Sequence, residues 1–556
     1  MKPIVFCEEF TSISDLFQYL PDDFKRRVKT FIRNDRFHYL DDYLKKIGAT
    51  SVIIECEYVD RNFIEDYCGH YARCFNDYPK KCHRLHFFSH KISEKHIKER
   101  LLLTSDREIN KRSLQESYLG FIVLRPIPQA MLGKVCLKTY PPEKGKNRIF
   151  PVLKDYKAHL LGEELIVKSI AYQEQDKVIS ACATSALWSA FHAVGQKNID
   201  DIHSPFHITE NARKVIASSH SSNILDKGLY LPQMASAIKE EGLDPLMLEF
   251  RSISYTKALV RAYLNIGLPV ILGMTLRYQN ETGQVNGKLK KFPIGDHAVV
   301  IAGYNINTNK IPQFSSDNIS SHGLKLDPLF MIASGISKFY VHDDQIGPFA
   351  SMTCRGEYWQ HLETRWNYYK NKEDAIYATP TTLIIPCYKK IRVRFASIWN
   401  FTSSINSLLG DFWRTNGYNL VWDIRLTYVN DLKHNVLLNH IHIPKENKLE
   451  FLSYQMPRYL WQVDCWISHK EEIESKPVAT YLFDATDMPT SDLLVAALNY
   501  DPQFYFTCQK SAVLITDGKT EQDLQNLFPD LTLRTLLEAY KNDSFTGEIL
   551  KSYYRE

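Results

Sequence analysis

Cys182 is the side chain of this sequence best placed to act as a nucleophile, because it lies where a helix is expected to begin. Residues 173–195 read as a polar loop followed by a helix, with Gly195 as its stop. The expected buried stripe consists of five apolar residues at helical spacing: Ala186, Leu187, Ala190, Phe191 and Val194. Unpaired backbone N–H groups and the helix dipole at such a position favour a thiolate and can receive an oxyanion. The competing interpretation is a small core cysteine in a helix rich in alanine and serine.

Two later segments carry a histidine and carboxylates suited to assist a thiolate. A continuous apolar strand is predicted over residues 295–304, with His297 at its beginning, where an imidazole can point into a cleft. A second strand is predicted over 338–347 and ends in Asp343 and Asp344, which can orient a histidine on a neighbouring strand. The alternatives are a structural histidine and aspartates that cap a turn.

The elements that must position these residues fall into three expected domains: residues 1–150, 151–388 and 389–556. A turn rich in proline, glycine and lysine at 141–146 marks the first boundary. Both outer domains are predicted to mix helices and strands.

Apolar periodicity and breaker residues predict further elements. Helices are expected at 12–20, 22–47, 228–242, 257–265, 405–416, 520–528 and 531–542. Strands are expected at 51–58, 116–128, 267–273, 391–395, 420–429, 460–468 and 478–487. Residues 276–291 are polar and predict a hairpin or a mobile lid, and residues 305–323 predict a polar loop.

The composition of the 556-residue chain is that of an ordinary globular protein too long for a single core. It is 44% hydrophobic and 24% charged, and its net charge of +4 is too small to favour nucleic acid or an anionic membrane as the main partner. We expect neither a signal peptide nor a membrane-spanning helix, because no long apolar run is present. The 11 cysteines have irregular spacings, which favours a reducing compartment and hence a cytoplasmic protein.

One segment is rich in side chains that can bind zinc: Cys68, His70, Cys74, Cys82, His83, His86 and His90. It lacks a closely spaced cysteine pair, and its spacings match no compact zinc motif. We therefore expect a packed aromatic and histidine-rich structure there, and neither a metal ion nor an organic cofactor in the protein.

The ordered segments around Cys182, His297 and Asp343 resemble the papain-like cysteine peptidase superfamily, most closely the branch of bacteriocin leader peptidases of bacterial transporters. The matching segments, which cover about 40% of the chain, are Gln175, Cys182–Leu187, Gly267–Ile271, Asp296–Tyr304 and Val341–Gly347. The resemblance implies an α+β fold in which the helix bearing the cysteine packs on an antiparallel sheet. N- and C-terminal mixed α/β domains would flank this central papain-like domain.

The resemblance also implies a role for each matched residue. Cys182 would be the nucleophile, and His297 would hold it as a thiolate and later protonate the leaving amine. Asp343 would fix the imidazole tautomer, and Gln175 would donate its side-chain amide to the oxyanion.

The sequence departs from the family pattern at positions that leave two of these roles open. Gln175 lies one residue further before the cysteine than the family's glutamine usually does, and Gln173 lies further still. Ala183 and Asp344 stand where the branch usually has glycine and proline. Gln173 is therefore an alternative oxyanion donor, and Asp344 is an alternative orienting residue.

The sequence thus predicts an intracellular cysteine peptidase that cleaves a protein or peptide partner through a Cys-His-Asp triad. Two alternatives stay open: an acyl transferase or deamidase that uses the same thiol chemistry, and a papain-fold binding module without catalysis. The flanking regions resemble uncharacterised bacterial proteins, and we expect them to gate or select the substrate. The sequence indicates no oligomeric state.

Overall fold

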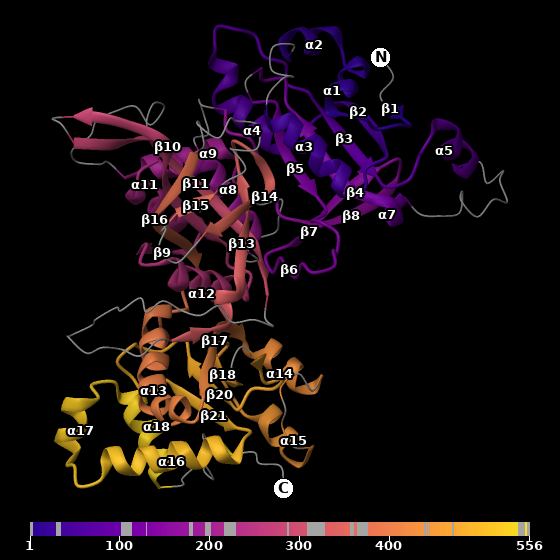
Figure 1. The fold of residues 1–556 in the computed structure, drawn as a ribbon. Helices are drawn as coiled ribbons and strands as arrows, with labels where there is room; N and C mark the ends of the chain where they lie inside the picture. Colours follow the sequence, from indigo (N-terminus) through magenta and orange to yellow (C-terminus); the bar gives the residue numbers. More distant parts are fainter. Residues whose placement is uncertain are drawn as a thin grey trace.

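Figure 1 shows the computed structural model, in which three sheet-containing parts follow one another along the molecule. The N-terminal part is indigo and violet, the central part magenta and pink, and the C-terminal part orange and yellow. The structure describes residues 4–28, 35–101, 114–128, 130–176, 182–194, 202–215, 229–285, 288–307, 329–355, 361–363, 376–438, 441, 443, 445–469, 472–542 and 551–552.

The N-terminal part is built on a five-stranded antiparallel sheet whose strands pair in chain order. These strands are β1 (Ile4–Cys7), β2 (Ser51–Tyr58), β3 (Cys82–Phe88), β4 (Tyr118–Leu124) and β5 (Leu132–Leu137). The helices are α1 (Ile13–Leu16), α2 (Asp22–Val28), α3 (Asp35–Lys46), α4 (Arg61–Gly69), α5 (Glu94–Leu101) and α7 (Leu114–Ser117), with short 3-10 helices at Phe17–Tyr19 and Tyr71–Arg73. Because β3 and β4 are buried along their whole length, both faces of this sheet are covered.

After β5, the chain first pairs with a strand of the central part and then forms hydrogen bonds with the N-terminal sheet. Strand β6 (Arg148–Ile149) pairs with a central strand, and β7 (Lys154–Leu160) and β8 (Glu163–Ser169) form a hairpin. The Ser169 hydroxyl donates to the Leu137 carbonyl at 2.7 Å, and Tyr172 exchanges backbone hydrogen bonds with Val135 at 2.8 and 3.0 Å. The segment that leads to Cys182 is therefore bound to strand β5.

The central part contains, within the described residues, a six-stranded antiparallel barrel. Its strands are β10 (Val270–Val285), β11 (Lys288–Ile306), β13 (Ile336–Asp343), β14 (Gly347–Arg355), β15 (His361–Glu363) and β16 (Ile376–Cys387). The barrel closes because Ile271 of β10 pairs with Val300 of β11 on one side and Ile384 of β16 on the other. Strand β9 (Asp244–Glu249) extends the sheet from β16. The protein is thus an α+β protein with several sheets.

The central helices are α8 (Cys182–Ala193), α9 (Pro205–Arg213), α11 (Leu231–Glu240) and α12 (Ile253–Leu264). Helix α8 lies against β11 and also contacts β10 and β13 of the barrel. The five predicted stripe residues of α8 are buried, but so is all of Ala183–Ala193. The reason is that α8 is packed against α9 and α11 as well as against the barrel.

The C-terminal part is built on a mixed sheet in which β12 (Phe330–Met331) pairs parallel to β17. The other strands are β17 (Tyr418–Tyr428), β18 (Tyr459–His469), β19 (Glu472–Ile473), β20 (Ala479–Asp484), β21 (Leu494–Asn499) and β22 (Lys551–Ser552). The helices are α13 (Phe395–Thr415), α14 (Val429–Leu437), α15 (Lys445–Ser453), α16 (Pro502–Thr516), α17 (Glu521–Leu527) and α18 (Leu531–Lys541), and a 3-10 helix at Ile332–Gly335 follows β12.

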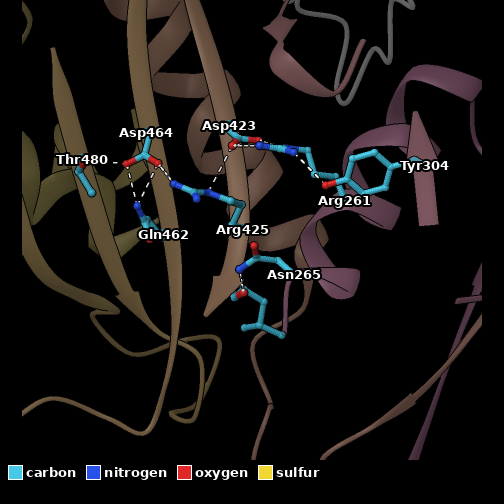
Figure 2. A network of polar contacts seen from close by, with 9 residues as sticks. Arg261, Asn265, Tyr304, Asp423, Arg425, Gln462, Asp464 and Thr480 are labelled. Carbon is cyan, nitrogen blue, oxygen red and sulfur yellow. Dashed lines mark hydrogen bonds and ion pairs between the residues drawn. The ribbon is translucent and has the colours of Figure 1, made fainter. Parts of the chain in front are cut away.

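A polar network joins the central part to this C-terminal sheet (Figure 2). Arg261 of α12 makes two bonds of 2.7 Å to the carboxylate of Asp423 on β17, and donates to the Tyr304 hydroxyl of β11 at 2.9 Å. Arg425 lies 3.3 Å from Asp423 and pairs with Asp464 on β18. Burial alone would raise the pKa of the Asp423 carboxyl, but the charges of Arg261 and Arg425 outweigh burial and hold it below its ordinary value.

Most of the predicted elements correspond to observed ones, and one is wrong. Residues 276–291 form the outer part of the β10–β11 hairpin, whose tip at 286–287 lies outside the described residues. Residues 391–395 alternate between buried and exposed as predicted for a strand, but they lead directly into α13. The amides of Arg392 and Val393 both bond to the Ala485 carbonyl, which is not a ladder pattern. Gly195 and most of 305–323 lie outside the described residues.

Every helix within the described residues is too short or too polar to cross a bilayer.

Candidate functional site

Cys182 is the first residue of α8 and is partly exposed, in contrast to the buried remainder of the helix. Its thiol therefore stands at the N-terminal end of a 12-residue helix, where backbone N–H groups lack intrahelical acceptors. The positive end of the helix dipole stabilises negative charge on sulfur at this position. All 11 cysteines of the chain are free thiols.

His297 lies on β11, opposite Met274 of β10, in the barrel wall that contacts α8. Its side chain is 1% exposed. The Cys182 thiol lies close enough to this imidazole to be one of the influences that raise its pKa. The structure therefore brings the predicted nucleophile and the predicted base into contact, although they lie more than 100 residues apart in the sequence.

Asp343 ends β13, the strand that pairs with β11 on the other side from β10. Its Oδ1 atom lies 3.0 Å from Nε2 of His297 and also accepts the Gln345 backbone N–H at 3.0 Å. The second bond fixes the carboxylate within the turn that follows the strand. Because Nε2 is engaged by Asp343, the ring nitrogen that can face Cys182 is Nδ1.

Asp344 is buried beside the same imidazole, but its carboxylate lies further from the ring than the carboxylate of Asp343. Its Oδ1 lies 3.7 Å from Nε2 of His297, and neither of its carboxylate oxygens has a hydrogen-bond partner within the described residues. Burial raises the pKa of this carboxyl to about 6; the charge of Asp343 adds to the rise, while the charges of His297 and Arg36 oppose it. The distances favour Asp343 over Asp344 as the orienting residue.

The charges around His297 favour its protonated form. Burial by itself lowers the pKa of the imidazole, but the charge and hydrogen bond of Asp343, the bond to Cys182 and the charge of Asp344 raise it well above its ordinary value. An imidazolium that lies beside a thiol at a helix N-terminus stabilises a thiolate, and it can return a proton to a leaving group. The arrangement is therefore suited to nucleophilic attack on a carbonyl followed by general acid catalysis.

Both glutamines considered for the oxyanion lie in the segment before α8. The side chain of Gln175 is partly exposed and makes no hydrogen bond within the described residues. Gln173 is buried, and its amide nitrogen has no partner there either. Gln173 has the stronger need for a partner, because a buried N–H without one is costly.

Among the described residues, this site also has the spacing of ligand atoms that a metal ion needs. His297, Asp343 and Asp344 offer ligand atoms that lie within 4.8 Å of one another. Two carboxylates that lie near the same imidazole nitrogen necessarily give this grouping. A metal ion would have to displace the bond between Nε2 and Asp343, so the hydrogen-bonded triad is the interpretation that uses the contacts present.

Part of the cysteine- and histidine-rich segment near the N-terminus packs into the first sheet: Cys82, His83 and His86 lie on the buried strand β3, whereas Cys68 and His90 are exposed. His86 lies on β3, where its ring bonds to Glu55 at 2.9 Å and to the Tyr118 hydroxyl at 3.1 Å. Cys82 is fully buried, and Cys74 lies 3.6 Å from a ring nitrogen of His70. These contacts fit the expected packed structure.

Sequence reasoning missed the residues that hold the site from the N-terminal part, above all Arg36 and Glu174. Arg36 lies on α3 and pairs with Glu174, which immediately precedes Gln175. The signal in the sequence was weak: Arg36, Tyr39 and Tyr43 share one helix face. That spacing indicates a docking face but does not indicate what the face contacts.

No protein-family model matches this chain, and no curated protein matches its sequence. The function therefore has to be argued from the geometry of the site.

Proposed function

We propose that this chain is a papain-like cysteine hydrolase, and that it acts as a peptidase on a protein or peptide partner. The observation that carries the proposal is one imidazole with two contacts. His297 bonds to Asp343 at 3.0 Å and also contacts the partly exposed thiol of Cys182. These are the three chemical groups that thiol-dependent acyl chemistry requires, in the order in which it uses them.

Each residue has a defined task in the proposed reaction. The Cys182 thiolate attacks the substrate carbonyl carbon, and the carbonyl electron pair moves to oxygen. Backbone N–H groups at the start of α8, with Gln173 or Gln175, stabilise that oxyanion. Collapse of the tetrahedral species breaks the C–N bond, and the His297 imidazolium gives its proton to the leaving amine. Water, deprotonated by the now neutral imidazole, then hydrolyses the thioester.

The architecture supports the family resemblance seen in the sequence. A buried helix with a nucleophile at its first residue lies against an antiparallel barrel, and strands of that barrel carry the base and the carboxylate. This is the arrangement implied by a papain-like domain. The free state of all 11 cysteines supports our further proposal that the protein works in the cytoplasm.

The primary test compares two thiols in one chain. Cys68 is exposed and serves as the internal reference for Cys182. At pH 6 ordinary thiols, with pKa values near 8.5, are almost fully protonated and react slowly. We expect iodoacetamide to label Cys182 at least about tenfold faster than Cys68, as measured by peptide mass mapping over time. His297→Gln should remove this difference without changing the labelling of Cys68.

Three other outcomes would contradict the proposal. Equal labelling of the two cysteines in the wild-type protein would identify an inert binding module. Unchanged selectivity in His297→Gln would exclude the imidazole as the activating group. A Cys182 labelling rate that changes when EDTA is added would indicate a metal ion at His297, Asp343 and Asp344.

The type of acyl chemistry is tested by trapping the substrate. Cys182→Ala keeps the binding surface but removes the nucleophile, so partners captured by this variant are candidate substrates. Incubation of a captured partner with the wild-type protein should yield two fragments. A change of mass in an intact partner would instead identify a deamidase or an acyl transferase.

A further inference from the structure

One arginine of the N-terminal part connects the two segments that flank the candidate site. Nη1 of Arg36 pairs with the Glu174 carboxylate, and its Nε donates to the Gln345 carbonyl at 3.2 Å. Glu174 precedes Cys182 by eight residues, and Gln345 directly follows Asp344. The side chains of Arg36 and Glu174 are 16% and 6% exposed, so the bridge is largely shielded from water.

Glu174 is itself fixed to the N-terminal sheet. Its second carboxylate oxygen accepts the Leu132 backbone N–H at 3.0 Å, and its carbonyl accepts a bond from Arg125 at 3.1 Å. Two residues later, the Asp176 carboxylate accepts the Tyr71 hydroxyl at 2.8 Å. The segment before Cys182 that contains Glu174 and Asp176 is therefore positioned by hydrogen bonds to the N-terminal part.

The turn after Asp344 rests on the same face of α3. The Tyr39 hydroxyl donates to the Pro348 carbonyl at 2.7 Å. Gly347 has a φ of +152°, and a Cβ atom there would lie 2.4 Å from the Tyr39 ring. Tyr43 stacks on Phe349, with ring centroids 6.3 Å apart. Because residues 36, 39 and 43 share one helix face, α3 holds the turn as one rigid unit.

We propose that Arg36 is a positioning residue of the active site, and that the N-terminal part is a built-in activating element of the enzyme. This inference rests on the proposed function. Arg36 would hold the segment before the nucleophile and the turn after the carboxylates in register with each other. Its charge would also keep Asp344 ionised, and an ionised Asp344 supports the His297 imidazolium.

The charged and polar groups around Asp344 come from several elements. His297 faces it from β11, Asp343 precedes it on β13, and Arg36 faces it from α3 with its partner Glu174. Tyr172, in the segment before α8, donates its hydroxyl to the Asp344 carbonyl at 3.3 Å. Burial raises the pKa of the Asp344 carboxyl to about 6, and the charge of Arg36 opposes that rise. Loss of Arg36 would therefore leave Asp344 protonated up to a higher pH.

The test measures the pH dependence of iodoacetamide labelling at Cys182, with the exposed Cys68 as the internal reference. Arg36→Gln should lower the maximal Cys182 rate at least about fivefold and move the acid limb up by about one pH unit. Arg36→Lys retains the charge but lacks the planar fork whose Nε and Nη1 reach Gln345 and Glu174 at once, so it should lower the maximal rate and leave the acid limb in place.

The matched control is Lys45→Gln, which removes an exposed charge from the same helix. Lys45 lies nine residues after Arg36, about 13 Å along the helix axis, and its variant should reproduce both the wild-type rate and the wild-type pH profile. If Arg36→Gln fails to fold by circular dichroism, Glu174→Gln breaks the same bridge and should lower the maximal rate in its place.

The two proposals fail in different ways. If wild-type Cys182 labels no faster than Cys68, the proposed function is wrong and this inference fails with it. If wild-type Cys182 is selectively labelled but folded Arg36→Gln, or in its absence Glu174→Gln, matches the wild-type profile, only the role of Arg36 is overturned. An equal fall in rate with Lys45→Gln would likewise overturn it, because the effect would then be one of charge at a distance.

Discussion

Replacement of Asp344 by asparagine should stabilise the protein while it weakens the site. Asp344 is a buried carboxyl beside Asp343, and burial raises its pKa from an ordinary 3.8 to about 6. A carboxyl whose pKa is raised on folding stabilises the native state fully below pH 3.8. That contribution is lost as the pH rises through about 6, because the ionised form is then held in a site that disfavours it.

The size of the effect follows from the difference between the two pKa values. A pKa difference of about 2 corresponds to about 3 kcal/mol, since each pKa unit is worth about 1.4 kcal/mol. The full difference applies at pH 7.5, and about half of it applies at pH 5, where most of the native population is protonated. Asparagine does not ionise, so Asp344→Asn should unfold at higher denaturant than the wild type, with a larger gain at pH 7.5 than at pH 5.

The assay is guanidinium unfolding at both pH values, followed by circular dichroism. Asp155→Asn is the control, because Asp155 is exposed on β7 and its replacement should change the free energy of unfolding by less than about 0.5 kcal/mol. Cys182 labelling should fall in Asp344→Asn, because one of the charges that support the imidazolium is lost. A variant no more stable than the wild type at pH 7.5 would refute the reasoning, since Asp344 would then have a partner that satisfies its charge.

Two further substitutions test the contacts on either side of the barrel. Asp343→Asn should slow Cys182 labelling at least about 100-fold, because an amide neither fixes the tautomer nor stabilises the imidazolium. Its alkaline limb should move to lower pH, since Asp343 raises the pKa of His297, and a full pH profile with an unmoved limb would contradict this. Asp423→Asn should reduce the free energy of unfolding by about 3 kcal/mol, because Arg261 would be left buried without its counter-charge. Urea titrations check this value, and a loss no greater than that of the exposed Asp411→Asn would disprove it.

The sequence was informative about the site because each key residue borders a strong local pattern. Cys182 begins an apolar helix, Asp343 ends an apolar strand, and His297 precedes the apolar run of a strand that in the structure already begins at Lys288. Such boundaries follow from local periodicity, which a single sequence displays. The order of the three residues along the chain then limited the chemistries that they could perform together.

The missing parts of the prediction all depend on contacts between distant residues. The pairing of Ile271 with Ile384 closes the barrel, yet the sequence of neither strand indicates that it pairs with the other. Arg36 meets Gln345 across 309 positions, and no periodicity records that meeting. Helix α16 was not predicted at all, because exposed apolar residues such as Leu514 obscure its amphipathic pattern.

Strand β11 carries His297 at its middle and Tyr304 near its C-terminal end, and Tyr304 belongs to the polar network of Figure 2. Any attempt to transfer the proposed catalytic site into a smaller polypeptide must therefore account for Arg261, which loses its carboxylate partner when β17 is removed. A miniaturised version should either carry β17 with it or exchange Arg261 and Tyr304 for apolar side chains of similar volume, which remove the unmatched charge altogether.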